Sequence, residues 1–304
     1  MNAAPVDPPS VHSETGATDP AGVSASDSAA PVPPVPDLVP RGHDWRIAWA
    51  LARRDLRARY LRSQLGAVLT LLQPVLWLTT AVLAFWFLMG VGTDSLNTPS
   101  WVVYAVRTAA ALAVWLPIAE CWGRAPSAFA GQAPLIRRTR FPLLSIPLAV
   151  CLAACVTGGL SLAIAVLLAP WTVGMTAASF VWGLVGGTIL TVLWAAAGSY
   201  LLAAVGVFFR DLNSVIGHFL ALGMLITPVY YDPSLVPARW QWVLYFNPLA
   251  APVMMLRQAF GGARPDEVAT MPLQFVFSAS LGLIALWAGL TLIARVRGKI
   301  PELL

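Results

Sequence analysis

Charged residues are scarce in this sequence, and their scarcity argues against a soluble domain. Of the 304 residues only 11% are charged and 58% are hydrophobic, whereas soluble domains carry about 25% charged residues. Lysine occurs once, at Lys299, and histidine occurs at His12, His43 and His218. Because the few charges separate long apolar runs, the chain is predicted to be an all-α integral membrane protein.

The motifs of common enzyme sites are also missing. The single Gly-Lys pair, at 298–299, is followed by Ile300 and is not part of a Walker A sequence. Neither His-Glu-x-x-His nor Gly-x-Ser-x-Gly occurs. The three cysteines (Cys121, Cys151 and Cys155) lie in apolar runs, and we interpret them as small buried residues rather than as metal ligands. The sequence therefore predicts no catalytic residue, no metal site and no cofactor in this chain.

The N-terminal segment has a different composition from the rest of the chain. Its first 40 residues hold nine prolines and five acidic residues, with no lysine or arginine. A secretory signal needs a basic start and an apolar core, and neither is present. Residues 1–44 are therefore predicted to be a disordered, Pro/Ala/Ser-rich acidic tail, and residues 45–304 a membrane domain.

A basic amphipathic helix is predicted over residues 45–62, with the sequence WRIAWALARRDLRARYLR. Its apolar stripe, at helical spacing, consists of Trp45, Trp49, Ala52, Leu56 and Tyr60. Its basic residues are Arg46, Arg53, Arg54, Arg57, Arg59 and Arg62. Such a helix can lie in the headgroup plane of an anionic leaflet. The alternative is an ordinary positive flank of the next span.

Six apolar runs are predicted to cross the membrane. They cover about residues 66–88, 102–122, 143–169, 175–209, 213–230 and 273–294. The fourth run would form a helix of about 50 Å, longer than a bilayer core of about 30 Å, so it must tilt or extend beyond the membrane. Residues 240–260 are apolar but are interrupted by an Asn-Pro pair and by Arg257. A re-entrant or interfacial pair of short helices is therefore predicted between the fifth and sixth spans.

The distribution of basic residues predicts the orientation. With the N-terminus inside, fifteen lysines and arginines lie on the inner side. The outer side then holds four, namely Arg107, Arg239, Arg257 and Arg264. The asymmetry predicts a multi-pass protein of the plasma (inner) membrane with both termini in the cytoplasm.

The fourth span carries a small residue at every fourth position. The series is Gly183, Gly187, Thr191, Ala195, Ser199 and Ala203. Helices associate inside lipid by close backbone packing over small side chains. One face of this span is therefore predicted to press against another helix over nearly its full length.

Two charged residues and one histidine fall inside the predicted spans. Glu120 is expected to pair with Arg124 four residues later, and Arg107 is expected to extend outward to water. His218 is interpreted as a satisfied polar residue rather than a proton relay. Because no acid lies at mid-depth, the energy for any transport must come from elsewhere than ion coupling.

Four stretches resemble the permease subunits of type-2 ABC exporters, in particular those that export O-antigen, capsule and teichoic acid. They are RRDLRARYLRSQLGAVLTLLQPVLW (53–77), APLIRRTRFP (133–142), VFFRDLNSVIGHFL (207–220) and TPVYYDPSLVPARWQWVLYFNPLAAPVMMLRQAF (227–260). Their order and spacing match the family pattern over about residues 45–300. The resemblance implies export of a lipid-linked polysaccharide or cell-wall glycan across the plasma membrane.

The resemblance also implies partners. Two copies of the chain would form a homodimer around a central pathway, and two copies of a separate ABC ATPase, holding ATP and magnesium, would dock on the cytoplasmic face. A short helix between the second and third spans would enter a cleft of the ATPase. Its candidate coupling residues are Leu135, Ile136, Arg137, Arg138, Arg140 and Phe141. By charge alone the same segment reads as a plain positive-inside loop.

Substrate contacts are implied at two places. The helix at 45–62 resembles the family's in-plane helix at the cytoplasmic entrance, where Arg53, Arg54, Arg57, Arg59, Tyr60 and Arg62 would gather an anionic lipid-linked substrate. The candidate aromatic residues of the path are Trp77, Phe85, Trp86, Tyr230 and Tyr231. A type-2 exporter of a drug or small lipid, and a membrane scaffold without transport activity, stay open as alternatives.

Overall fold

The described part of the chain is helical. The computed structural model describes residues 42–61, 64–84, 100–138, 141–171, 177–209, 211–260 and 265–300. All of them belong to one unit, Asp37–Leu304, and within these ranges there is no strand. The predicted tail at 1–44 lies outside the described residues except for its last three, which form the start of the first helix.

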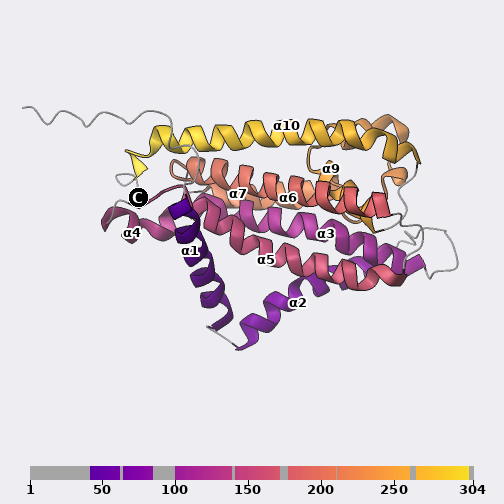
Figure 1. The fold of residues 1–304 in the computed structure, drawn as a ribbon, viewed down its shortest axis with the longest axis horizontal. Helices are drawn as coiled ribbons and strands as arrows, with labels where there is room; N and C mark the ends of the chain where they lie inside the picture. Colours follow the sequence, from indigo (N-terminus) through magenta and orange to yellow (C-terminus); the bar gives the residue numbers. More distant parts are fainter. Residues whose placement is uncertain are drawn as a thin grey trace, which may run out of the picture. The chain divides into compact units, whose positions relative to one another are not determined.

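Seven longer helices and several short ones make up the described part of this unit (Figure 1). The longer ones among the described residues are α1 (Gly42–Leu61), α2 (Gln64–Ala81), α3 (Ser100–Arg124), α5 (Ser145–Leu168), α6 (Ala177–Gly206), α7 (Leu212–Ile226) and α10 (Pro265–Val296). The shorter α-helices are α4 (Ala133–Arg138), α8 (Trp242–Phe246) and α9 (Ala250–Ala259). The 3-10 turns are η3 (Ala125–Ser127), η4 (Ala130–Gln132), η5 (Ala169–Trp171), η6 (Pro233–Leu235) and η7 (Ala238–Trp240).

Four helical stretches of the described chain are long and apolar enough to cross a membrane. They are Trp101–Ser127, Ser145–Leu168, Ser179–Gly206 and Met271–Val296. Shorter apolar helices cover Leu72–Ala84 and Leu212–Ile226. The described part of the chain is therefore all-helical, and each of the six predicted spans coincides at least partly with an apolar helix.

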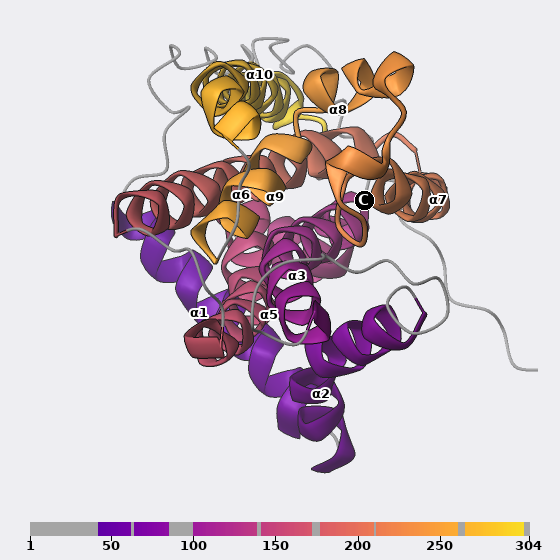
Figure 2. The same cartoon turned by 90° about the vertical axis from the view of Figure 1, so that its right-hand side faces the viewer.

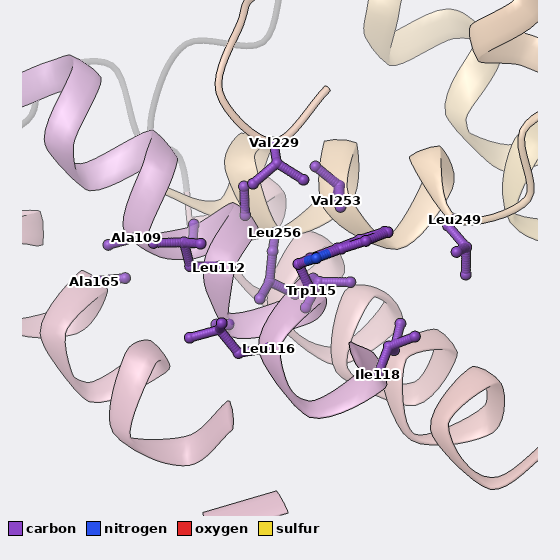
Figure 3. Close-up of a cluster of buried hydrophobic side chains, with 14 of the residues drawn as sticks. Ala109, Leu112, Trp115, Leu116, Ile118, Ala165, Val229, Leu249, Val253 and Leu256 are labelled. Atoms are coloured by element: carbon purple, nitrogen blue, oxygen red, sulfur yellow. The ribbon is translucent and has the colours of Figure 1, made fainter. Parts of the chain in front are cut away.

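The central helix of the bundle is α3. It contacts α5, α6 and α9 extensively, and α2 and α7 also pack on it (Figures 1 and 2). Its alanine-rich middle is buried, and Leu112, Trp115 and Leu116 project from it into the largest core cluster. In Figure 3 the Trp115 ring lies beside Val253 and Leu256 of α9. The core therefore joins helices that are more than a hundred residues apart in sequence.

The small-residue face of α6 is confirmed. All six predicted positions are buried. A β-carbon at Gly183 would meet the backbone of Met255 and Ala259, so α9 lies directly against this part of α6. Further along, the Ser199 hydroxyl donates to the Pro147 carbonyl of α5 at 2.8 Å. The packing partner thus changes along the helix, from α9 to α5.

A second core cluster lies at the end of the bundle that carries α1, α4 and the C-terminal end of α10. Its buried members include Ala48 and Ala52 of α1, Ile136 of α4, Ile293 of α10 and Ile300, together with residues of α5 and α6. Figure 1 shows α1, α4 and the C-terminal end of α10 at the same end of the bundle. This end therefore has its own apolar core, separate from the one around α3.

Two short helices occupy the region predicted to hold a re-entrant pair. The first, α8, ends before Asn247, whose carboxamide donates to Thr227 Oγ1 at 2.9 Å and accepts from the Leu249 amide at 3.0 Å. The second, α9, packs on α6 and α3. The predicted break at the Asn-Pro pair is confirmed, since α8 ends at Phe246 and α9 begins at Ala250. The Asn247 side chain stabilises the turn between them through its two hydrogen bonds.

Candidate functional site

The basic amphipathic helix is present as α1. Its small residues Ala48 and Ala52 are fully buried, and the helix packs on α5. The Trp45 and Trp49 side chains, however, are 50% and 57% exposed. The predicted single apolar stripe is therefore divided. Ala52 of the stripe faces the bundle together with Ala48, whereas the tryptophans of the stripe lie on the exposed side beside Arg53, which is exposed as well.

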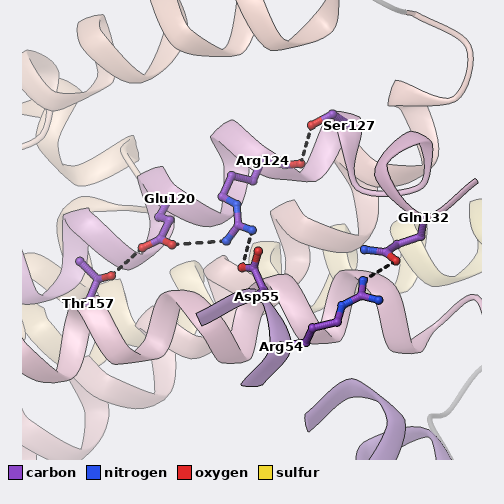
Figure 4. Close-up of polar contacts among 7 residues, drawn as sticks. All are labelled: Arg54, Asp55, Glu120, Arg124, Ser127, Gln132 and Thr157. Carbon is purple, nitrogen blue, oxygen red and sulfur yellow. Dashed lines mark hydrogen bonds and ion pairs between the residues drawn. The ribbon is translucent and has the colours of Figure 1, made fainter. Parts of the chain in front are cut away.

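A chain of polar contacts joins α1 to α3 and α5 (Figure 4). Arg124, the last residue of α3, donates from Nη2 to Asp55 Oδ2 of α1 at 2.6 Å and from Nη1 to Glu120 Oε1 at 3.4 Å. The Thr157 hydroxyl of α5 donates to Glu120 Oε2 at 2.6 Å. The predicted Glu120–Arg124 pair is confirmed and belongs to a larger group. We call Asp55, Glu120, Arg124 and Thr157 the α1 junction.

The residue preceding Asp55 makes a second connection. Arg54 donates from Nη2 to Gln132 Oε1 at 2.8 Å. Gln132 ends η4 and directly precedes α4. Two neighbouring residues of α1 therefore hold two elements, the end of α3 and the start of the segment predicted to couple to an ATPase (Figure 4).

The predicted coupling residues have different environments. Ile136 is buried in the second core cluster, and Phe141 packs against that cluster. Leu135 is half-buried and Arg137 is exposed, whereas the side chain of Arg138 and the whole of Arg140 lie outside the described residues. Ile136 therefore anchors α4 to its own bundle, and Arg137 is the predicted coupling residue that the described structure leaves on the surface.

A second polar group lies near the opposite end of α3. Arg107 forms an ion pair with Asp232, at 3.2 Å between Nη1 and Oδ2. The side chain of Arg107 is only 13% exposed, so the expectation that it extends outward to water is wrong. The reason is a partner 125 residues away in sequence, which satisfies the guanidinium inside the protein.

Arg257 of α9 completes this second group, which we call the α9 junction (Arg107, Asp232 and Arg257). It is 9% exposed and donates from Nη1 to the carbonyl oxygens of Pro228 at 2.7 Å and Tyr231 at 2.6 Å. This role of Arg257 is not evident from the sequence, where the residue is only a charge that interrupts an apolar run. The one available signal was that a charge inside an apolar segment needs partners.

The pKa of the Asp232 carboxyl is lowered in this environment. Burial on its own raises the pKa. The backbone amide and hydroxyl of Ser234 and the nearby guanidinium groups act in the opposite direction, and their effect is larger. Asp232 is therefore held as a carboxylate, the form that pairs with Arg107.

The candidate aromatic path residues are only partly accessible. Trp77 of α2 is exposed. Tyr230 is buried, with its carbonyl accepting from the Tyr104 hydroxyl at 2.8 Å, so it offers no surface to a substrate in this structure. Tyr231 is half-buried and donates to the Ile226 carbonyl at 2.9 Å. The candidates outside the described side chains are Phe85, Trp86, Arg59, Tyr60 and Arg62.

Comparison with known families decides what kind of protein carries these junctions. Residues 47–260, more than half of the chain, match the family described as "ABC-2 type transporter". The chain belongs to the ABC-2 type transporter family. The matched range of this ABC-2 permease includes both junctions and ends at the residue after α9, so α10 lies beyond it.

Relatives of the permease carry names that describe export. It is 24% identical over 264 residues to the "O-antigen export system permease protein RfbA" of Klebsiella pneumoniae, covering 86% of this chain and 96% of that protein. A protein of the same name from Myxococcus xanthus is 27% identical over 260 residues, covering 83% and 93%. The resemblance to type-2 ABC exporters is confirmed, and the chain is a transporter membrane subunit rather than an enzyme.

Proposed function

We propose that this permease moves a lipid-linked polysaccharide or cell-wall glycan, such as O-antigen or teichoic acid, out across the plasma membrane. The observation that carries the proposal is the alignment with O-antigen export permeases, which covers 96% and 93% of those two proteins. An alignment of this extent includes nearly all of each relative. The transported class is therefore carried over from whole proteins rather than from one shared segment.

We further propose six spans with both termini in the cytoplasm. Four long apolar helices and two shorter ones support the number of spans. The excess of basic residues on one side supports the orientation. In this arrangement α1 and α4 lie on the cytoplasmic side, the α9 junction lies on the outer side, and α8 and α9 form the re-entrant pair.

The proposed energy source is a separate ABC ATPase that binds ATP and magnesium. The sequence has no Walker A motif of its own. The exposed guanidinium of Arg137 on α4 is suited to bidentate contacts with carboxylates of a partner. Two copies of the permease and two copies of the ATPase would form the working exporter.

The proposed entrance for the substrate is the exposed side of α1. Arg53 and Arg57 are exposed there, next to Trp45 and Trp49. Arginine attracts anionic headgroups and diphosphates, and tryptophan favours the membrane interface. This side of α1 therefore suits a lipid-linked glycan that arrives along the cytoplasmic leaflet.

A reconstitution experiment tests the proposal. The permease is purified together with candidate ABC ATPase subunits and placed in lipid vesicles. The rate of ATP hydrolysis is then measured with and without a lipid-linked glycan. We expect a stable complex whose ATP hydrolysis rises with the glycan. A complex that responds to small lipids or drugs and not to any lipid-linked glycan would contradict the proposed substrate class.

A further inference from the structure

Two tryptophans and one serine form a continuous line of hydrogen bonds through the bundle. The Trp122 indole of α3 donates from Nε1 to the Trp194 carbonyl of α6 at 2.9 Å. The Trp194 indole donates from Nε1 to Ser278 Oγ of α10 at 3.0 Å. The Ser278 hydroxyl donates to the Pro248 carbonyl, in the turn between α8 and α9, at 2.7 Å. We call Trp122, Trp194 and Ser278 the tryptophan network.

The chemistry of these groups fixes the direction of each hydrogen bond. A carbonyl oxygen only accepts and an indole N–H only donates. The single hydroxyl proton of Ser278 is therefore committed to Pro248, and its lone pair accepts from Trp194. All three side chains of the network are buried, and Ser278 is fully so. Because a buried polar group without a partner is costly, the network is satisfied only when all four elements are in place.

Glycines allow the helices of the network to approach closely. A β-carbon at Gly198 of α6 would meet the indole nitrogen of Trp122. A β-carbon at Gly282 of α10 would lie 2.8 Å from the Leu193 side chain and 3.5 Å from the Trp194 ring. The helix α6 contacts both α3 and α10, as its place between them in Figure 1 indicates. The two indoles therefore occupy space that the sequence leaves open on both sides of α6.

One end of the network lies at the middle of α10. Ser278 is about 20 Å from the first residue of this helix, Pro265, and lies within the apolar stretch Met271–Val296. The turn that contains Pro248 therefore reaches the middle of α10 rather than its end. The neighbouring Asn247 donates to Thr227 Oγ1, so the same turn is also tied to the end of α7.

The other end of the network lies beside the α1 junction. Trp122 is two residues before Arg124, which ends α3 and donates to Asp55 of α1. Arg54, the residue before Asp55, donates to Gln132 just before α4. The tryptophan network therefore begins at the end of α3 that is held by α1, and it ends at the turn between α8 and α9.

We infer that the tryptophan network positions the turn between α8 and α9 relative to α3 and thereby couples ATP hydrolysis to export. Each of its hydrogen bonds joins a different pair of elements, so a shift of α3 or α6 either moves the turn as well or breaks a bond. Its members are positioning residues, because they act through the turn. The inference rests on the proposed function and adds the residues that link the α1 junction to the re-entrant pair.

The coupling ratio of Ser278→Ala tests the inference. The full-length variant is assembled with its ATPase in lipid vesicles, and both ATP hydrolysis and export of a lipid-linked glycan are measured. Glycan exported per ATP should fall about threefold to tenfold, the change expected for one lost hydrogen bond, while the complex still assembles and hydrolyses ATP. A ratio equal to that of wild type overturns the inference, even if both rates fall together.

A neighbouring serine provides the matched control. Ser280 is exposed on the same helix, and its hydroxyl donates to the Val276 carbonyl of that helix at 2.7 Å. Ser280→Ala therefore removes a serine hydroxyl without breaking a contact between elements, and its ratio should equal that of wild type. A fall as large as that of Ser278→Ala would overturn the role of the network.

A double variant tests whether the two side chains act together. Ser278→Ala leaves the buried Trp194 indole without its acceptor, and Trp194→Phe removes that N–H. The double variant should therefore lose less than the product of the two single losses in glycan exported per ATP. Trp287→Phe with Ser280→Ala, both at exposed positions of α10, is the control pair and should keep the wild-type ratio. Losses that multiply would contradict a shared network.

Two further readouts keep the test decisive. If Ser278→Ala does not assemble, Trp194→Phe alone is used, because it leaves the bond between Ser278 and Pro248 intact. A wild-type ratio in that variant overturns the inference. The Tm of the permease in detergent needs no substrate, and the two single changes should be non-additive there as well. By contrast, a wild-type complex that exports no lipid-linked glycan overturns the proposed function itself, whatever the Tm values are.

Discussion

Arg257 shows how a single buried charge can organise a loop. Its guanidinium donates to the carbonyl oxygens of Pro228 and Tyr231, so the chain after α7 is held against α9. The nearby carboxylate of Asp232 compensates its charge and pairs with Arg107. The α9 junction therefore satisfies two guanidinium groups and one carboxylate that would each be costly alone.

The carboxylate of Asp232 is predicted to stabilise the fold at neutral pH and to lose this effect in acid. Its pKa is lowered below the ordinary value of 3.8 in the folded chain. A group whose pKa is lower in the folded state stabilises that state above its unfolded-state pKa. The contribution is therefore fully present at neutral pH, and it is lost as the pH falls through the folded-state pKa.

Thermal unfolding in detergent checks this prediction. Wild type should exceed Asp232→Asn in stability by about 1–3 kcal/mol at pH 7, and the difference should shrink as the pH falls below 3.8, the ordinary pKa of the carboxyl. Asp211→Asn, at an exposed position before α7, is the matched control and should leave the Tm unchanged at pH 7. A difference for Asp232→Asn that stays constant down to pH 3 contradicts the ion pair as its cause.

The Glu120–Arg124 pair could be predicted from the sequence, whereas the α9 junction could not. A pair four residues apart follows from helix geometry alone. Arg107 and Asp232 are 125 residues apart, and their contact depends on how α3 and the chain after α7 come together. Local periodicity carries no information about that approach, so the guanidinium of Arg107 was expected to reach water instead.

At the scale of elements, the contact between α6 and α9 depends on glycine. A β-carbon at Gly183 would meet the backbone of Met255 and Ala259, which cannot turn aside as a flexible side chain can. Gly183→Ala is therefore predicted to destabilise the permease by about 1–3 kcal/mol. Gly159→Ala on α5 meets nothing within 4 Å and should be neutral or slightly stabilising. The Tm values of both variants in detergent check the contrast.

The α1 junction is predicted to hold α1 by charge. Asp55→Arg places a second guanidinium beside that of Arg124 and should lower the free energy of unfolding by about 1–2 kcal/mol. The double variant Asp55→Arg with Arg124→Asp restores attraction and should recover at least half of the loss. Protease sensitivity of α1 and the Tm of each variant complete a double-mutant cycle.

A control on the same helix separates charge pairing from general perturbation. Arg57 is exposed, so Arg57→Asp should leave the packing of α1 unchanged. If the double variant is as unstable as the sum of its single changes, the junction does not position α1.

The helix itself and its basic character were predictable from periodicity, but its docking face was not. The burial of Ala48 and Ala52 depends on the shape of α5, which the apolar stripe alone does not specify.

At the scale of the whole molecule, α4 is predicted to separate internal anchoring from partner binding. Arg137→Glu should lower the amount of co-purifying ATPase at least severalfold. The substitution replaces an exposed guanidinium with a carboxylate, which would repel the carboxylates of the partner. Ile136→Ala should instead lower the free energy of unfolding of the isolated permease by about 2–4 kcal/mol, because Ile136 is buried in the second core cluster. This loss of stability should appear as a lower Tm.

Two measurements on each variant distinguish these effects. The Tm of the permease alone should be normal in Arg137→Glu and lowered in Ile136→Ala. Lys299→Glu, at another exposed basic residue, is the charge control and should leave the recovery of ATPase unchanged. If Arg137→Glu recovers the ATPase in full and couples its hydrolysis normally to export, Arg137 does not contribute to ATPase binding. The segment would then be a plain positive-inside loop.

The second core cluster has a consequence for biosynthesis. It includes Ala48 of α1 and Ile300, which follows α10. The ribosome must therefore synthesise the chain through residue 300 before α1, α4 and the end of α10 can pack in one cluster. Until then α4 lacks part of its support, so the end of the bundle that carries it is completed only after the helices before α10 have been made.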